Sequence, residues 1–188
     1  STRFMTPPEG GFTLLRNAVL SLSLTQEFVR PLYHWRTSRP HEYTHSMLNS
    51  MGDDNALFKA GPAHGAPPQN ICLSADNYLL DHLGGGFDLL YFTEQDAVPQ
   101  ALCEVVNGVR QQGVPVRIVA VGSGQTVAGA DTTLSDADGH FRQRYGVVAS
   151  GAGYLLRPDQ HVCARWLTLD AHRLQAAFDA ALLRSHKA

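Results

Sequence analysis

The chain has 188 residues, of which 44% are hydrophobic and 17% charged, and its formal net charge is −2. This composition is typical of one globular domain, alone or with an appendage, and excludes disordered and fibrous chains. The slight negative charge excludes the basic face that nucleic-acid binding needs, and no apolar run approaches the ~18 residues of a membrane span.

Three cysteines, Cys72, Cys103 and Cys163, are far apart in the sequence and form no CxxC pair. An odd number of cysteines without a secretory signal is typical of a reducing cytosol, so we expect a cytoplasmic protein with buried thiols. The chain starts Ser1-Thr2-Arg3 without an initiator methionine. We therefore expect a piece cut from a longer protein, with processing of a natural N-terminus as the alternative.

The first predicted element is an N-terminal helix over 11–32, ended or kinked by Pro31. Its apolar residues recur at helical spacing: Leu15, Ala18, Val19, Leu22, Phe28, Val29 and Leu32. Such a stripe needs a partner surface. The following segment, 33–59, is aromatic and poorly periodic and does not supply one.

Residues 61–68 predict a linker, because glycine and proline crowd the segment and no periodicity survives in it. Beyond it, helices and strands alternate. The predicted strands are 71–73, 87–92 and 114–121. The predicted helices are 77–83, one capped by Asp96 and ended by Gly113, and one capped by Ser135 or Asp136 that runs to Tyr145.

The end of the chain predicts a β-hairpin and a closing helix. Arg157-Pro158-Asp159-Gln160 is a turn between two apolar runs. Thr168 or Asp170 caps a helix with Leu174, Phe178, Ala181 and Leu182 turned inward. The order β-α-β-α-β-α-β-β-α predicts an α/β fold with a mixed five-stranded sheet flanked by helices, as in a thioredoxin-like domain.

One short motif suggests a metal site. His41-Glu42-Tyr43-Thr44-His45 matches HExxH, in which two histidines on one helix face bind zinc and the glutamate activates water. Pro40 precedes it, and no apolar helical stripe surrounds it. The longer form of the motif needs Gly and His where Leu48 and Met51 stand. We expect a surface segment; a zinc-dependent hydrolase using His41, Glu42 and His45 is the alternative.

Three other patterns are expected to be structural. Residues 122–127, Gly-Ser-Gly-Gln-Thr-Val, approach a dinucleotide fingerprint but have Val127 at the third glycine. Residues 136–139, Asp-Ala-Asp-Gly, are similar to a calcium loop but lack its outer ligands, so they predict capping and a turn. A set of basic and aromatic residues is expected to pack on a partner surface: Arg30, Tyr33, Trp35, Arg36, Arg39 and Tyr43.

The chain resembles the C-terminal portion of FAD-dependent aromatic hydroxylases of the 3-(3-hydroxyphenyl)propionate hydroxylase and phenol hydroxylase type. Motifs in a shared order and spacing carry the resemblance: Leu15-Arg16-Asn17-Ala18-Val19-Leu20-Ser21-Leu22, the Gly61-Pro62 to Pro67 linker, Leu79-Leu80-Asp81-His82-Leu83-Gly84, Phe87-Asp88-Leu89-Leu90, Arg144-Tyr145-Gly146 and Tyr154-Leu155-Leu156-Arg157-Pro158-Asp159. None is a catalytic signature by itself.

The resemblance implies a division of the chain and a reaction. Residues 1–60 would end the flavin and substrate region, 61–68 would link, and 69–188 would form a thioredoxin-like C-terminal domain. The parent protein would hydroxylate an aromatic ring with FAD, NAD(P)H and O2, and this part would serve structure and homodimerisation. Its partner would be the N-terminal flavin-binding region, and no cofactor is expected on these residues.

The resemblance to a thioredoxin-like domain does not extend to the residues that carry out redox chemistry. The position of a CxxC reads Thr93-Glu94-Gln95-Asp96-Ala97, and Gly151-Ala152-Gly153 stands where a cis-proline would precede the hairpin. We therefore assign no catalytic, cofactor-binding or metal-binding residue. A free-standing, redox-inactive thioredoxin-like binding module is a further alternative, and it differs from the first hypothesis only in the natural length of the gene.

Overall fold

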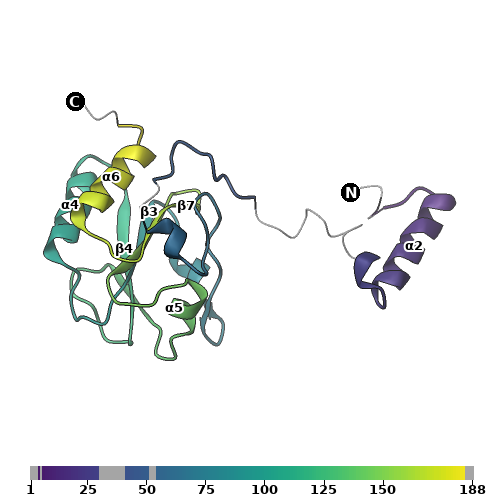
Figure 1. Cartoon of the computed structure of the whole chain (residues 1–188), viewed down its shortest axis with the longest axis horizontal. Coiled ribbons are helices and arrows are strands. Elements are labelled where there is room, and N and C mark those ends of the chain that lie inside the picture. Colours follow the sequence, from purple (N-terminus) through teal and green to yellow (C-terminus); the bar gives the residue numbers. More distant parts are fainter. Residues whose placement is uncertain (1–3, 5, 30–40, 51–53, 185–188) are drawn as a thin grey trace. The chain divides into compact units, whose positions relative to one another are not determined.

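A computed structural model describes residues 4, 6–29, 41–50 and 54–184, and the chain separates into two compact units, 1–40 and 41–188 (Figure 1). In the first unit, helix α2 (Gly11–Ser23) is followed by a 3-10 turn, η1 (Glu27–Val29). The predicted N-terminal helix is confirmed but ends earlier than expected. Pro31 and the basic and aromatic residues Arg30, Tyr33, Trp35, Arg36 and Arg39 lie outside the described residues.

The second unit is built on one five-stranded sheet in the order β5-β4-β3-β6-β7. Its strands are β3 (Phe87–Phe92), β4 (Val116–Gly122), β5 (Thr132–Ser135), β6 (Ala152–Leu156) and β7 (Val162–Trp166). β3, β4 and β5 run parallel, whereas β6 and β7 are antiparallel to their neighbours. The predicted α/β class with a mixed five-stranded sheet is confirmed.

The central strand β3 is buried on both faces, so successive side chains enter two different cores. Leu89 and Tyr91 pack with α4 (Gln100–Gln111) and α6 (Ala171–Ala181), which lie together on one face (Figure 1). Leu90 and Phe92 pack on the other face with the short helix α5 (His140–Arg144) and the 3-10 turn η3 (Leu79–His82). None of the described helices is long and apolar enough to cross a membrane.

The hairpin and the last helix follow the sequence prediction. Gln160 donates its N–H to the Arg157 carbonyl at 2.8 Å and closes the turn between β6 and β7. Asp170 caps α6 by accepting from the Arg173 N–H at 2.8 Å. Because these signals act over a few residues, the sequence was sufficient to place them.

Two helix starts differ from the prediction. α4 begins after Pro99, and its buried residues are Leu102, Val106 and Val109. Asp96 does not cap it, because Pro99 is the residue at the N-cap and no side chain bonds there. The Asp96 carbonyl accepts from the Ala128 N–H at 2.7 Å and holds a neighbouring loop. Before α5, Asp136 does act as a cap and accepts from Phe141 and Arg142 N–H groups, but the helix starts only at His140.

Two predicted elements before β3 are wrong in part. The expected strand 71–73 is β1 (Cys72–Ser74), which lies outside the large sheet and pairs with β2 (Asn77–Tyr78). β2 takes the first residues of the expected helix 77–83, which leaves only η3. The fifth place in the sheet belongs to β5, which the sequence analysis missed because parallel pairing with β4 is a non-local contact.

Residues 41–50 and 54–68, here called the strap, run along the edge strand β7. The Gly65 N–H donates to the Val162 carbonyl at 2.7 Å, and the Val162 N–H donates to the Ala66 carbonyl at 2.9 Å. The Ser50 N–H donates to the Cys163 carbonyl at 2.7 Å. The strap therefore satisfies backbone groups that an uncovered edge strand would expose.

Two buried tyrosines link β6 to the end of α5 and to Gln69, the residue that follows the strap. The Tyr154 hydroxyl donates to the Tyr145 carbonyl at 2.6 Å, and the Tyr145 hydroxyl donates to the Gln69 carbonyl at 2.8 Å. Gly61 lies against both with φ +87°, and an added Cβ would clash with the Tyr154 hydroxyl. This contact, here called the tyrosine junction, leaves no room for a side chain at position 61.

The tyrosine junction predicts that Gly61→Ala is strongly destabilising. The new Cβ would meet the Tyr154 hydroxyl and lie 2.5 Å from the Tyr145 carbonyl oxygen. Overpacking and a left-handed backbone together should lower the free energy of unfolding by about 3 kcal/mol. Urea unfolding followed by circular dichroism measures the change.

Gly113→Ala is the matched control, because Gly113 also has φ +84° but has nothing within 4 Å of an added Cβ. It should lose only about 1 kcal/mol, the cost of the backbone conformation. Equal losses in the two variants would show that the tyrosine junction does not constrain position 61.

Candidate functional site

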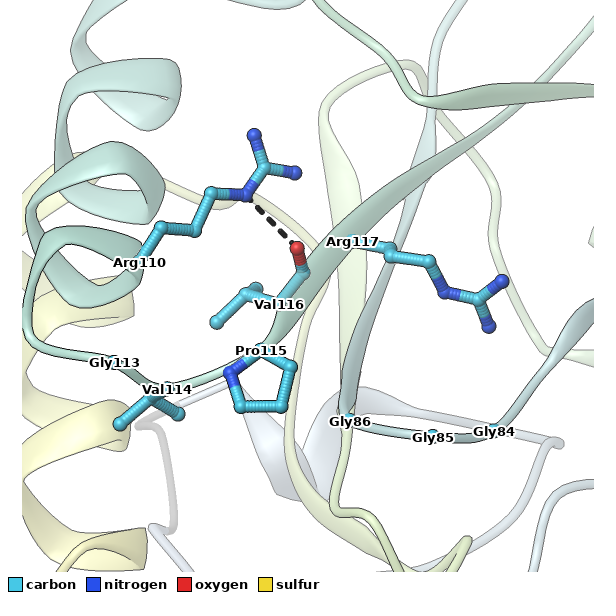
Figure 2. Close-up of a pocket in the computed structure, with 9 residues that line it drawn as sticks. All are labelled: Gly84, Gly85, Gly86, Arg110, Gly113, Val114, Pro115, Val116 and Arg117. Carbon is cyan, nitrogen blue, oxygen red and sulfur yellow. Dashed lines mark hydrogen bonds between the residues drawn. The ribbon is translucent and has the colours of Figure 1, made fainter.

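A pocket on the second unit lies at the amino-terminal ends of β3 and β4 and has a volume of about 560 Å³ (Figure 2). Two glycine-containing loops and two arginines line it: Gly84, Gly85, Gly86, Gly113, Val114, Pro115 and Val116, with Arg110 and Arg117. Gly86 permits the two loops to approach, since a Cβ there would lie 2.5 Å from the Pro115 carbonyl oxygen. The Phe87 N–H donates to that same oxygen at 2.9 Å.

The two arginines of this pocket are already paired, and their guanidinium groups lie on either side of β4 (Figure 2). Arg110 pairs with Asp131 and donates to the Val116 carbonyl at 2.9 Å. Arg117 pairs with Asp88 at 2.7 Å and donates to the His82 carbonyl at 2.9 Å. The pocket therefore offers polar contacts but no uncompensated positive charge for an anion.

Asp88, the partner of Arg117, is a buried acid with a side chain that is 2% exposed. Burial raises the pKa of the Asp88 carboxyl, and this effect outweighs the opposing Gly84 N–H bond at 2.8 Å and the Arg117 guanidinium. The residues that line the pocket are glycine, valine, proline and arginine, so they include no nucleophile and no acid–base pair. The pocket can hold a small group but has no chemistry of its own.

Ion pairs occupy the position where a thioredoxin would carry its dithiol. Glu94 pairs with Arg142, whose guanidinium also donates to the Thr93 carbonyl at 3.0 Å. The Glu94 N–H donates to the Ser150 hydroxyl at 3.1 Å. These contacts hold the end of β3 to α5 and to the loop before β6, and the segment provides no thiol.

All three cysteines are free. Cys163 is fully buried in the sheet, and burial raises the pKa of its thiol to about 12. Burial also raises the pKa of the half-buried Cys103 thiol. Cys72 is exposed. The predicted absence of a cysteine pair is confirmed for these residues.

The structure does not support the zinc motif. His41, Glu42 and His45 are exposed and lie in loops and turns, so the two histidines do not share a helix face. Tyr43 instead packs against His41 and His161 at ring distances of 4.5 and 5.2 Å. Among the described residues, no three His, Cys, Asp or Glu side chains are grouped to hold a metal ion.

In the dinucleotide-like segment 122–127, Gly122 ends β4 and the remaining residues form a loop, as predicted. Val127, at the place of the third glycine, is buried and donates its N–H to the Thr133 hydroxyl at 3.1 Å. Asp136 serves as a helix cap, and Asp138 accepts from the His140 N–H at 3.1 Å. These motifs therefore have structural roles.

Sequence reasoning missed the pocket and the tyrosine junction. In the sequence, Gly84-Gly85-Gly86 predicts only a break before β3. Arg110 and Arg117 meet the pocket through the parallel pairing of β3 with β4. The glycine at position 61 could have signalled a close backbone approach, since glycine is required at such contacts.

No protein-family model and no curated protein sequence matches the chain. Solved structures do match. They include K252c-soaked RebC (20% identity, TM-score 0.58, 97% of this chain and 30% of that one) and the flavin-dependent monooxygenase PieE with FAD and substrate (19%, 0.59, 98% and 32%). Aklavinone-11 hydroxylase with FAD and aklavinone also matches (21%, 0.53, 90% and 34%). At these identities the matches show a shared fold, and the chain spans about a third of each structure.

The different burial of the three cysteines predicts that their thiols react at different rates. With a pKa of about 12, Cys163 is ionised at roughly 1 part in 10⁴ at pH ~8, so it should be inert to a disulfide reagent such as DTNB. Native protein should show one fast thiol, which Cys72→Ser removes and Cys163→Ser leaves unchanged. Oxidation that consumes two thiols within one chain would contradict the described geometry.

Proposed function

We propose that this chain is the C-terminal part of a longer FAD-dependent hydroxylase of aromatic rings and that it serves a structural role there. One observation carries the proposal: flavoprotein structures match 90–98% of this chain, yet the chain amounts to only about a third of each of them. The ordered motifs that resemble aromatic hydroxylases agree with this assignment. The chemistry would reside in the rest of the parent protein.

We infer that the flavin site lies outside this chain. A dinucleotide needs a glycine-rich turn whose backbone approaches the pyrophosphate at a helix N-terminus. The closest sequence, 122–127, has the buried Val127 in place of the third glycine and leads into β5 rather than a helix. We therefore place FAD, and with it NAD(P)H, on the part of the parent protein that precedes this chain.

We further propose the division 1–60, 61–68 and 69–188, with the last part a thioredoxin-like domain. The strap would then connect the flavin and substrate region to the sheet. That the parent protein is a cytoplasmic homodimer and uses NAD(P)H and O2 is proposed from the resemblance alone.

Exposed leucines in and just after helix α2 support the proposal that the first unit packs against a partner. Leu14, Leu15 and Leu24 are 75%, 59% and 82% exposed, and a 13-residue helix is marginal in water without packing. Burying three such leucines against a partner would contribute about 5–9 kcal/mol. We propose the flavin-binding region of the parent protein as this partner.

Two measurements test the proposed function. Coding sequence upstream of Ser1 should contain a GxGxxG turn after a strand, and the protein expressed from that longer sequence should show flavin absorbance. This chain expressed alone should show none. Flavin bound tightly by this chain alone, or a gene that holds only these residues, would contradict the proposal; the second result would favour a free-standing binding module.

A variant of α2 tests its role as an interface. When this chain is titrated with the separately expressed upstream region, Leu15→Glu should weaken binding by about 2 kcal/mol or more, roughly 30-fold in Kd, because a charge replaces a leucine that the proposed interface would bury. Asn17→Glu is the control, since Asn17 is an exposed polar residue that already bonds Arg16 at 3.0 Å. Equal affinities for both variants would remove α2 from the interface.

A further inference from the structure

The strap contains one buried titratable group without an obvious structural purpose, His64. Its side chain lies between the strap and the sheet, and the residue is 4% exposed. The ring bonds to the backbone of Ser50, whose own N–H donates to the Cys163 carbonyl of β7 at 2.7 Å. Nε2 is buried and has no hydrogen-bond partner among the described residues. The adjacent residue Gly65 makes the 2.7 Å bond to Val162, so the ring lies at the attachment point of the strap.

We propose that His64 is a pH-sensitive latch: the neutral ring lets the strap lie on the edge of β7, and protonation of the ring releases the strap. A protonated ring would carry an N–H at Nε2 with nothing to accept it in a site closed to water. Because a buried and unpaired charge is costly, the proton and the closed strap exclude one another. The device concerns the strap and does not depend on the proposed hydroxylase function.

The charged groups around the ring oppose protonation. Arg165 from β7 is buried beneath the strap, donates to Asn55 at 2.7 Å and to the Pro62 carbonyl at 3.0 Å, and lies over the Phe58 ring. Burial first, and the positive charge of Arg165 second, lower the pKa of His64, and the bond to Ser50 opposes them only in part.

The acids on the neighbouring elements are engaged elsewhere. Asp54 accepts from the Leu167 N–H at 2.8 Å and pairs with Arg173 of α6. Asp159 in the hairpin turn pairs with Arg157 and faces His161. His41, Glu42 and His45 of the strap are exposed. Among the described residues, therefore, no acid offsets the positive charge that a protonated His64 ring would carry.

The direction of the pH effect follows from the lowered pKa. In the open state the ring titrates near pH ~6.5, and in the closed state it titrates lower. The contribution of the neutral ring to closure is therefore complete above pH ~6.5 and is lost as the pH falls toward the closed-state pKa. Opening takes up one proton, so the opening constant should rise by up to about tenfold per pH unit in that range.

Hydrogen exchange of the full chain tests the latch. Protection factors, which divide out the pH dependence of intrinsic exchange, are measured for the Ser50, Gly65 and Val162 amides between about pH 7.5 and about pH 5. Wild type should lose up to about 30-fold in protection at these amides below pH ~6.5. Amides in the middle of β3 and β4 should not change.

His64→Gln is the test variant, because an amide can still bond to Ser50 and stays neutral throughout. Its protection at the three amides should be independent of pH. His172→Gln, at an exposed histidine of α6, should behave as wild type does. Protection in wild type that does not change with pH, or an unchanged pH dependence in His64→Gln, would overturn the latch. Should His64→Gln not fold, an NMR titration of the wild-type His64 ring decides, and a pKa above ~6.5 overturns it.

Discussion

The tyrosine junction is the constraint on which the arrangement of the second unit depends. Tyr145 follows α5 and Tyr154 lies in β6. The Tyr154 hydroxyl donates to the Tyr145 carbonyl, and the Tyr145 hydroxyl donates to the Gln69 carbonyl, so the two bonds bring three separate segments together. Burial raises the pKa of both phenols, so each stays a neutral donor at any physiological pH. Gly61 and Gly146 meet this junction where side chains would not fit. With the junction in place, the strap lies along β7 and closes that edge of the sheet.

The same residues explain why a sequence resemblance without catalytic signatures is informative. In the sequence, Gly61, the Arg144-Tyr145-Gly146 run and Tyr154 are separate motifs that share only their order with the aromatic hydroxylases. The structure brings them into one contact, with an added Cβ at Gly146 lying 2.6 Å from the Ala60 carbonyl oxygen. These motifs therefore specify how a strap packs on a sheet. They agree with the structural role proposed for this chain, and the pocket between Gly86 and Pro115 is lined by no nucleophile and no acid–base pair.

Local signals in the sequence predicted the elements that depend on a few neighbouring residues, and non-local pairing set the rest. The apolar run of β3, the Arg157–Gln160 turn and the Asp170 cap are of the first kind. β5 is of the second: a short strand with two threonines joins the sheet only because β4 lies beside it. The pocket between Gly86 and Pro115 likewise needs the parallel register of β3 and β4. Composition at 61–68 indicated a linker, but it did not reveal that Gly65 and Ala66 bond to β7; the domain boundary there stays a prediction.

The most direct test of this account compares the free energy of unfolding of residues 41–188 with that of residues 69–188. If the strap is an integral part of the sheet unit, residues 41–188 unfold cooperatively. Removal of the strap then lowers the free energy of unfolding by at least about 3 kcal/mol, because three hydrogen bonds to β7 are lost and Tyr154 and Arg165 become exposed. Two pieces with the same free energy of unfolding and the same dependence on urea would contradict it.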